Sequence, residues 1–290
     1  MSKVSIIIPT STAEHLAKKI KAKANNLKVI FPEKNKEGKR HFPDGELYLR
    51  ISKANKLKNK RVVVLHSGAP EPNEGLVELK IILQILKDNK VKPEVFFSYF
   101  SYGQQDKIFK KGETNVAENL IKELVNYYKA KKIYIIDPHF GGRDWIKKYP
   151  IVNISAVPFL IRKAWQDFEE NILFLSPDKG GKRRTGLLAA GKRRLNSFKV
   201  EIFSPKLALK GKIVGVVDDI VETGGTLLKF YDFAKKSGAK KVIALITHGA
   251  LPAGVSKIEK KYSKLYLTNT IKRKEANIDI TDLILKVISL

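Results

Sequence analysis

The chain has 290 residues, of which 43% are hydrophobic and 29% charged, and its formal net charge is +27. This balance is typical of a globular protein with one large or two ordinary domains. Its apolar runs are far too short to cross a bilayer, and no leader-like pattern opens the chain, so we expect a cytoplasmic protein without a membrane partner. Cysteine is absent, which excludes disulfides and thiolate metal sites.

The excess of lysine and arginine has two interpretations. A basic protein gains affinity for any polyanion by releasing counterions, which would suit nucleic-acid binding. A lysine-rich surface is also typical of hyperthermophiles and would suit a site for polyphosphate substrates. The lysines are dispersed along the chain and aromatic residues are not interleaved with them. We therefore do not expect nucleic acid to be the primary partner.

Short apolar runs alternate with amphipathic stretches in the first half of the chain. Strands are expected at residues 3–8, 27–31, 46–51, 61–66, 94–99 and 132–136. Helices are expected at residues 12–23, 73–87 and 114–128, the last with Thr114 as its N-cap.

The same rhythm restarts near Tyr149-Pro150. Strands are expected at residues 151–154, 172–175, 199–203, 213–217, 240–247 and 265–268. Helices are expected at 157–168, in a short basic stretch before Lys192, after Thr226 and from about Ala253. The alternation predicts an α/β fold with two similar domains, residues 1–150 and 151–290, each a mostly parallel sheet flanked by helices.

The stretch GVVDDIVETGGTLL, residues 215–228, is the strongest candidate for a binding site. A buried strand over 213–217 breaks into Asp218 and Asp219, and ligands of open α/β sheets bind beyond the carboxyl ends of strands. The following loop contains Glu222, Thr223, Gly224, Gly225 and Thr226, and opens an amphipathic helix. Its glycines and hydroxyls can cradle a phosphate at the helix N-terminus.

The two carboxylates would repel a bare phosphate, so they should serve sugar hydroxyls or a metal ion. Together with the loop they predict a ribose 5-phosphate site. The Walker A lysine and the three-glycine dinucleotide fingerprint are both missing. An ordinary strand–turn–helix with a threonine cap is the alternative, but paired acids beside two threonines and two glycines favour a binding loop.

This motif resembles the phosphoribosyl-pyrophosphate (PRPP) binding motif of the type I phosphoribosyltransferase fold. Four further segments lie where expected strands end or turn: FPDGE (42–46), SYGQQD (101–106), DPH (137–139) and SPDKGG (176–181). All five resemble, in order, segments of the ribose-phosphate diphosphokinase (PRPP synthase) family, with an archaeal or thermophile-like composition. They cover nearly the whole chain, whereas plain phosphoribosyltransferases are shorter and lack the N-terminal half.

The resemblance implies a Mg²⁺-dependent enzyme that transfers the diphosphoryl group of ATP to the 1-hydroxyl of ribose 5-phosphate, giving PRPP and AMP. Ribose 5-phosphate would bind Asp218, Asp219 and residues 222–226. The pyrophosphate loop would consist of Asp178, Lys179, Gly180 and Gly181. Asp178 and His139 would be the metal ligands; because Mg²⁺ prefers oxygen, a packing role for His139 stays open.

The resemblance also implies a homo-oligomer, because the FPDGE loop serves the ATP of a neighbouring subunit. The residues implied for ATP are Phe42, Asp44, Gly45, Glu46, Gln104, Gln105 and His139. An exposed hairpin-like turn is the alternative for the FPDGE segment. Asp137 and His139 are two apart and would share one face of an extended backbone.

Lys192 and Arg194 align with the family's flexible Lys-x-Arg loop, which makes them the implied catalytic pair. Diphosphoryl transfer depends mainly on positioning and charge neutralisation, and two cations over the β-phosphate would supply both. A second basic run, Lys182-Arg183-Arg184, lies close enough that the alignment could shift. No residue is assigned as a general base, and His66 and His248 are interpreted as structural.

One departure from the family falls in the SYGQQD segment. The family's Tyr-Ala-Arg-Gln-Asp is Tyr102-Gly103-Gln104-Gln105-Asp106 here, so a charge-assisted contact to ATP is lost. The alternatives are weaker ATP binding, a substitute cation, another nucleotide donor or a non-catalytic regulatory homologue. A phosphoribosyltransferase and a nucleic-acid-binding protein also remain open as functions.

Overall fold

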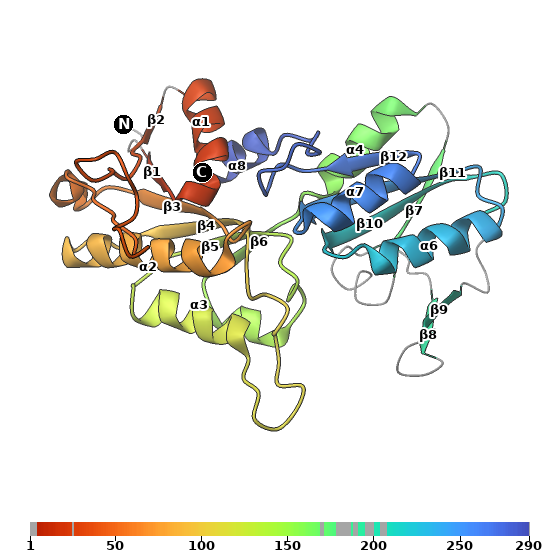
Figure 1. Ribbon diagram of the computed structural model, residues 1–290, viewed down its shortest axis with the longest axis horizontal. Coiled ribbons are helices and arrows are strands. Elements are labelled where there is room, and N and C mark those ends of the chain that lie inside the picture. Colours follow the sequence, from red (N-terminus) through yellow and green to blue (C-terminus); the bar gives the residue numbers. More distant parts are fainter. Residues whose placement is uncertain are drawn as a thin grey trace. The chain divides into compact units, whose positions relative to one another are not determined.

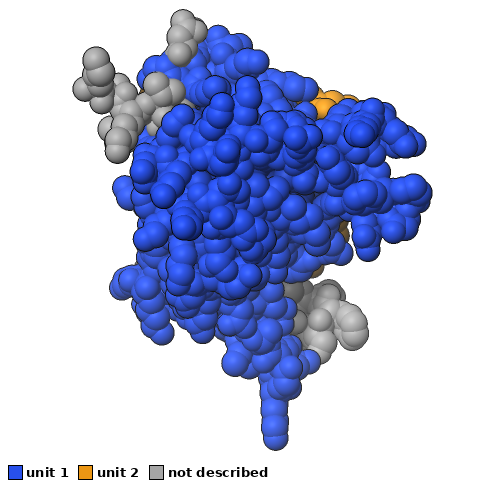
Figure 2. All heavy atoms as spheres, turned by 90° about the vertical axis from the view of Figure 1, so that its left-hand side faces the viewer, with its two compact units in different colours: residues 1–154, 281–290 blue, residues 155–280 orange. Residues whose placement is uncertain are grey.

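The computed structural model of the chain describes residues 5–24, 26–168, 171–177, 187, 191–194, 200–203 and 208–289. The chain divides into two compact units, which Figure 2 colours separately with a face of unit 1 in view. Unit 1 comprises Met1–Ile154 and Thr281–Leu290, and unit 2 comprises Ser155–Ile280. The division falls four residues after the expected residue 150, and the last ten residues join unit 1 rather than unit 2.

Unit 1 is built on a six-stranded parallel sheet (Figure 1). Its spatial order is β2 (Leu27–Val29), β1 (Ser5–Pro9), β3 (Val62–Ser67), β4 (Glu94–Tyr99), β5 (Ile133–Ile136) and β6 (Ile151–Ile154). The central strands are buried apolar runs, as a sheet covered on both faces requires. Because all pairs are parallel, the carboxyl ends of the strands share one edge.

Helices cover both faces of the unit 1 sheet (Figure 1). The helices α2 (Pro72–Asp88) and α3 (Val116–Asn126) pack on one face, where Leu79 and Ile121 join the core. The helices α1 (Glu14–Lys23) and α8 (Thr281–Ile288) pack on the other. Three short 3-10 helices complete the unit: η1 (Ser11–Ala13), η2 (Ala54–Leu57) and η3 (Asp144–Lys148).

Unit 2 contains a four-stranded parallel sheet in the order β12 (Lys264–Leu267), β11 (Lys241–Gly249), β10 (Ile213–Val221) and β7 (Ile172–Leu175). The helices α6 (Gly225–Lys236) and α7 (Pro252–Lys261) pack on one face, and α4 (Val157–Asp167) packs on the other. The strands β8 (Gly191–Arg194) and β9 (Val200–Phe203) form a separate antiparallel pair. The expected α/β fold class, with a helix-flanked parallel sheet in each unit, is therefore confirmed.

Three local expectations were wrong. Residues 46–51 form no strand and make only isolated bridges, His41 to Leu47 and Glu33 to Arg50. The N-cap of α3 is Asn115, whose side chain accepts a hydrogen bond from the Glu118 amide at 3.1 Å. The strand β10 does not end at Asp218 but continues to Val221, because β11 extends alongside it to Gly249 and supplies backbone partners.

None of the helices in the described part of the chain is long and apolar enough to cross a membrane. The short basic helix expected before Lys192 falls on residues outside the described part.

Candidate active site

The loop after β10 has the geometry of an anion-binding turn. Gly224 is the N-cap of α6 and has φ 80° and ψ 0°, a left-handed conformation that favours glycine. It is buried, whereas Thr223 and Gly225 are exposed. The first amides of a helix have no intrahelical acceptor and carry the positive end of the helix dipole. Here they open onto the exposed hydroxyl-bearing loop, which suits a phosphate.

The two carboxylates lie inside β10, just beyond the part of the strand that pairs with β7. Asp218 is 7% exposed and Asp219 is 2% exposed, and the Asp219 amide donates to Asp218 Oδ1 at 3.1 Å. Neighbouring strand residues face opposite sides, so Asp218 follows Val216 toward α6 and α7, and Asp219 follows Val217 toward α4. Two acids are thus held on opposite faces of β10, a few residues before the loop 222–226.

Three residues that the sequence analysis missed brace this loop. Gly254 on α7 packs so closely that a Cβ there would overlap the Glu222 carbonyl oxygen. The Tyr262 hydroxyl donates to the Leu227 carbonyl at 2.6 Å, and burial together with the Asp218 carboxylate raises the pKa of Tyr262. A glycine inside an amphipathic helix is a signal of close packing that the sequence carries.

Arg273 is the third bracing residue, and no local sequence pattern around it predicts this role. Its Nε donates to the Gly249 carbonyl at 2.9 Å and its Nη2 donates to the Ala250 carbonyl. The amide of Ala250 in turn donates to the Val221 carbonyl at 2.9 Å. Burial lowers the pKa of Arg273. Arg273 therefore fixes the end of β11 against the end of β10.

In unit 1 the segment 42–46 forms a tight turn. The Phe42 amide donates to the Glu46 carbonyl at 2.8 Å, and the Gly45 amide donates to the Phe42 carbonyl at 3.0 Å. The Asp44 side chain accepts from the Glu46 amide at 3.1 Å. Phe42 is 46% exposed and meets Tyr48 edge to face. The turn presents an aromatic ring and two acids to solvent.

The segment 101–106 follows β4 and is anchored by its last residue. Asp106 is 2% exposed and accepts two hydrogen bonds from Arg143, from Nε at 2.7 Å and from Nη2 at 2.9 Å. The Trp145 indole donates to the Asp106 carbonyl at 3.2 Å. Gln104 is exposed and Gln105 is half-buried. Arg143, absent from the sequence-based site, is a cation at this segment.

The segment 137–139 follows β5, the neighbour of β4, so it shares the carboxyl edge with residues 101–106. Asp137 has φ 36°, and the backbone there is not extended. The expectation that Asp137 and His139 share one face of an extended strand was therefore wrong. Among the residues that the structure describes, no three His, Asp or Glu side chains gather in a way that could hold a metal ion.

Several implied site residues lie outside the described part. Asp178, Lys179, Gly180 and Gly181 all do, although β7 leads toward them. The backbone of Lys192 and Arg194 lies in β8, paired with Ile202 and Val200 of β9, so this run is a strand and not the expected loop. The side chains of Lys192 and Arg194 are not among the described parts of the structure.

Two similar α/β units, one of them with an Asp-Asp strand that runs into a Thr-Gly-Gly-Thr loop, define a phosphoribosyltransferase-type protein. Residues 5–128 match the family model for the N-terminal domain of ribose phosphate pyrophosphokinase, and residues 191–282 match that for the phosphoribosyl transferase domain. The ribose-phosphate pyrophosphokinase of Pyrococcus furiosus is 30% identical over 98% of this chain and 100% of its own. The chain belongs to the ribose-phosphate pyrophosphokinase family.

Further comparisons agree with this assignment. The ribose-phosphate pyrophosphokinase of Sulfolobus acidocaldarius is 32% identical over 83% of this chain and 86% of its own. The crystal structure of phosphoribosylpyrophosphate synthetase from Mycobacterium smegmatis superposes with a TM-score of 0.82 at 22% identity, covering 99% of this chain and 98% of that one. That likeness extends the common fold over both units.

Proposed function

We propose that this chain transfers the diphosphoryl group of ATP to the 1-hydroxyl of ribose 5-phosphate, giving PRPP and AMP. Membership of the ribose-phosphate pyrophosphokinase family supports the reaction. The observation that carries the substrate assignment is the pair of buried carboxylates, Asp218 and Asp219, beside the phosphate-binding turn at the start of α6.

Ribose 5-phosphate is proposed to bind with its phosphate at the first amides of α6 and with its hydroxyls near the carboxylates. The hydroxyls of Thr223 and Thr226 and the backbone of Gly224 and Gly225 supply neutral donors to the phosphate. Carboxylates accept hydrogen bonds from the vicinal hydroxyls of a sugar and would repel its phosphate, which orients the substrate.

ATP is proposed to lie against the turn 42–46 and the segments 101–106 and 137–139. Phe42 offers a surface for the adenine, and Asp44 with Glu46 offers acceptors for its amino group or ribose. In this assignment the turn serves the ATP of a neighbouring subunit, so the chain acts as a homo-oligomer. We also place the enzyme in the cytoplasm, since its relatives are metabolic enzymes named ribose-phosphate pyrophosphokinase.

The proposed metal is Mg²⁺, and the residues proposed as its ligands are Asp178 and His139. The carboxylate suits Mg²⁺, which prefers oxygen ligands and keeps several waters, whereas the imidazole suits it less. When bound, the ion would neutralise phosphate charge. Asp218 and Asp219 supply further carboxylate oxygens on β10, the strand that pairs with β7.

Lys192 and Arg194 are proposed as the cations that neutralise the charge developing on the transferred group. Lys192→Ala is therefore expected to cut turnover about a hundredfold or more while substrate binding changes little. Lys229→Ala is the matched control, because Lys229 is exposed on α6. A Lys192→Ala enzyme that turns over at the normal rate would remove Lys192 from the mechanism.

The function is tested by measuring AMP release from Mg-ATP with and without ribose 5-phosphate, and PRPP formation in step. Asp219→Asn should weaken ribose 5-phosphate binding measured by calorimetry, with Asp232→Asn as control because the Asp232 side chain is 58% exposed on α6. Ribose 5-phosphate binding without AMP release would favour a regulatory homologue, for which the uncharged Gln104 is the supporting observation. A salt-dependent gel shift would favour nucleic-acid binding instead.

A further inference from the structure

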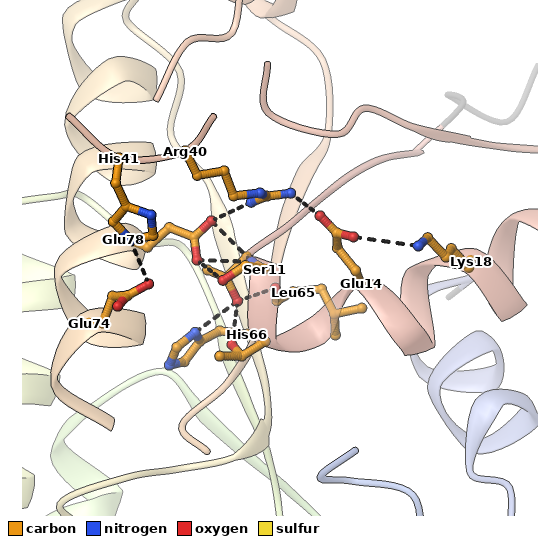
Figure 3. Close-up of polar contacts among 11 residues, drawn as sticks. Ser11, Glu14, Lys18, Arg40, His41, Leu65, His66, Glu74 and Glu78 are labelled. Atoms are coloured by element: carbon orange, nitrogen blue, oxygen red, sulfur yellow. Dashed lines mark hydrogen bonds and ion pairs between the residues drawn. The ribbon is translucent and has the colours of Figure 1, made fainter. Parts of the chain in front are cut away.

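Glu78 is a buried carboxylate on α2 that is not among the residues proposed to bind either substrate. Its side chain is 4% exposed, and it accepts hydrogen bonds from the Ser11 amide at 3.0 and 2.9 Å and from the Ser11 hydroxyl at 2.5 Å (Figure 3). Burial raises the pKa of Glu78, and the hydrogen bonds from Ser11 and the charge of Arg40 oppose this rise. A buried charge of this kind is tolerated because donors surround it.

Arg40 completes the shell around Glu78 and joins it to α1. Its Nη1 donates to Glu78 Oε1 at 3.2 Å and its Nη2 donates to Glu14 Oε1 (Figure 3). The Arg40 side chain is 24% exposed and Glu14 is 23% exposed, so both contacts are largely withdrawn from water. A guanidinium can hold two carboxylates at fixed directions, which an ammonium cannot.

Arg40 is also the base of the turn proposed to bind ATP. The Tyr48 amide donates to the Arg40 carbonyl at 2.7 Å, and the next residue, His41, bridges Leu47. The turn 42–46 is therefore closed at its base by residues 40–41 and 47–48. No regular strand supports this turn on the sheet, so its anchoring depends on side chains at its base.

The helix α2 also contacts the segment 101–106, the second segment proposed to bind ATP. The Tyr102 hydroxyl donates to Asn73 Oδ1, and Glu74 Oε1 is 3.1 Å from His41 Nε2. The contacts to the turn and to the segment 101–106 thus come from residues 73, 74 and 78 of α2. Residues 74 and 78 are four apart and lie on one face of the helix.

We propose that Arg40 is a positioning residue for ATP, which sets the turn 42–46 through Glu78 and Glu14. The first turns of α2 then hold both the turn 42–46, which is proposed to serve the ATP of a neighbouring subunit, and the segment 101–106 of the same chain. This inference rests on the proposed function, because it takes those segments as the ATP-binding ones.

Arg40→Ala tests the proposal. Removing the guanidinium breaks the links from the base of the turn to Glu78 and Glu14, whereas the His41–Glu74 contact remains, so the KM for ATP should rise about tenfold. The KM for ribose 5-phosphate should stay within twofold, because its proposed site lies in unit 2. The KM for ATP of Arg40→Lys should lie between the values of the wild type and of Arg40→Ala, since one ammonium cannot hold both carboxylates. Arg50→Ala is the control, because its pair with Glu33 is 3.6 Å long and Arg50 is 64% exposed.

A second variant keeps the test valid if Arg40→Ala does not fold. Glu14→Gln removes one charge at a partly exposed position and should raise the KM for ATP about threefold. An unchanged KM for ATP in both Glu14→Gln and Arg40→Lys would overturn the proposal. Equal rises in both KM values would also overturn it, because they would show a general structural defect.

The proposed function and this inference can fail separately. If the wild-type chain formed no AMP with ribose 5-phosphate, the proposed function would fail, and calorimetric binding of Mg-ATP would then be the readout. Weaker Mg-ATP binding by Arg40→Lys and Glu14→Gln than by Arg50→Ala would still support the positioning role. Equal binding by all three variants would reject it.

Discussion

Buried His66 should make unit 1 sensitive to mild acid. It is 0% exposed, its Nδ1 lies 3.0 Å from Thr10 Oγ1, and its ring meets Phe97 edge to face at 5.5 Å. Within the described part of the chain its Nε2 has no hydrogen-bond partner. Burial lowers the pKa of His66 from 6.5 to about 3.

The direction of the change in stability with pH follows from proton binding to His66. Between pH 6.5 and pH 3 the unfolded chain binds a proton at this residue and the folded chain does not, so stability falls as the pH falls. With these pKa values the free energy of unfolding should drop by about 2 kcal/mol between pH 7 and pH 5 through His66 alone. His66→Gln should remove this part of the pH dependence.

The assay uses the two tryptophans, one in each unit. In a Trp165→Phe background, Trp145 fluorescence follows urea unfolding of unit 1 at pH 7, 6 and 5. His41→Gln is the control, because the His41 side chain is 42% exposed. If His66→Gln lost as much stability between pH 7 and pH 5 as its parent, the reasoning would be refuted.

Three other substitutions test packing and charge. Gly254→Ala should displace the Glu222 carbonyl and weaken ribose 5-phosphate binding at least tenfold by calorimetry; normal affinity would show that the loop can move aside. Asp106→Asn leaves Arg143 unpaired and should cost about 3 kcal/mol in urea unfolding, unless water replaces the pair. Hydrogen bonds from Lys264 and Lys163 lower the pKa of Asp167 to about 2. The ionised Asp167 carboxylate therefore stabilises the fold above pH 4, and this contribution is lost as the pH falls toward 2. Asp167→Asn should therefore cost about 1 kcal/mol at pH 7, and the difference from wild type should shrink below pH 4. Because Asp167 lies in unit 2, urea unfolding is followed here by Trp165 fluorescence in a Trp145→Phe background.

The fold class could be predicted because it depends on local patterns. Runs such as Val62–Ser67 and the periodic apolar positions of Pro72–Asp88 specify a buried strand and an amphipathic helix without knowledge of their partners. The loop around Gly224 could be predicted for the same reason, since its chemistry lies in consecutive residues. The ends of helices and strands were harder to predict, because the extension of β10 past Asp218 depends on the length of its neighbour β11.

The contacts of Arg143 and Arg273 could not be predicted from local pattern. Arg143 meets Asp106 and Arg273 meets Gly249 across long stretches of chain, and each would pass as one more exposed cation in a lysine-rich sequence. The placement of α8 was hidden for a related reason. Its apolar face fits any sheet face that needs a cover, and only the three-dimensional arrangement assigns it to unit 1.

The placement of α8 has a consequence for synthesis on the ribosome. Ile284 and Ile288 cover Ile7 and Val63 of the unit 1 sheet, yet they follow the whole of unit 2 in the chain. Domains generally fold as they emerge, with the N-terminal one first. The nascent unit 1 must therefore keep part of an apolar sheet face uncovered until unit 2 has been translated. That interval is when this protein should most need a chaperone.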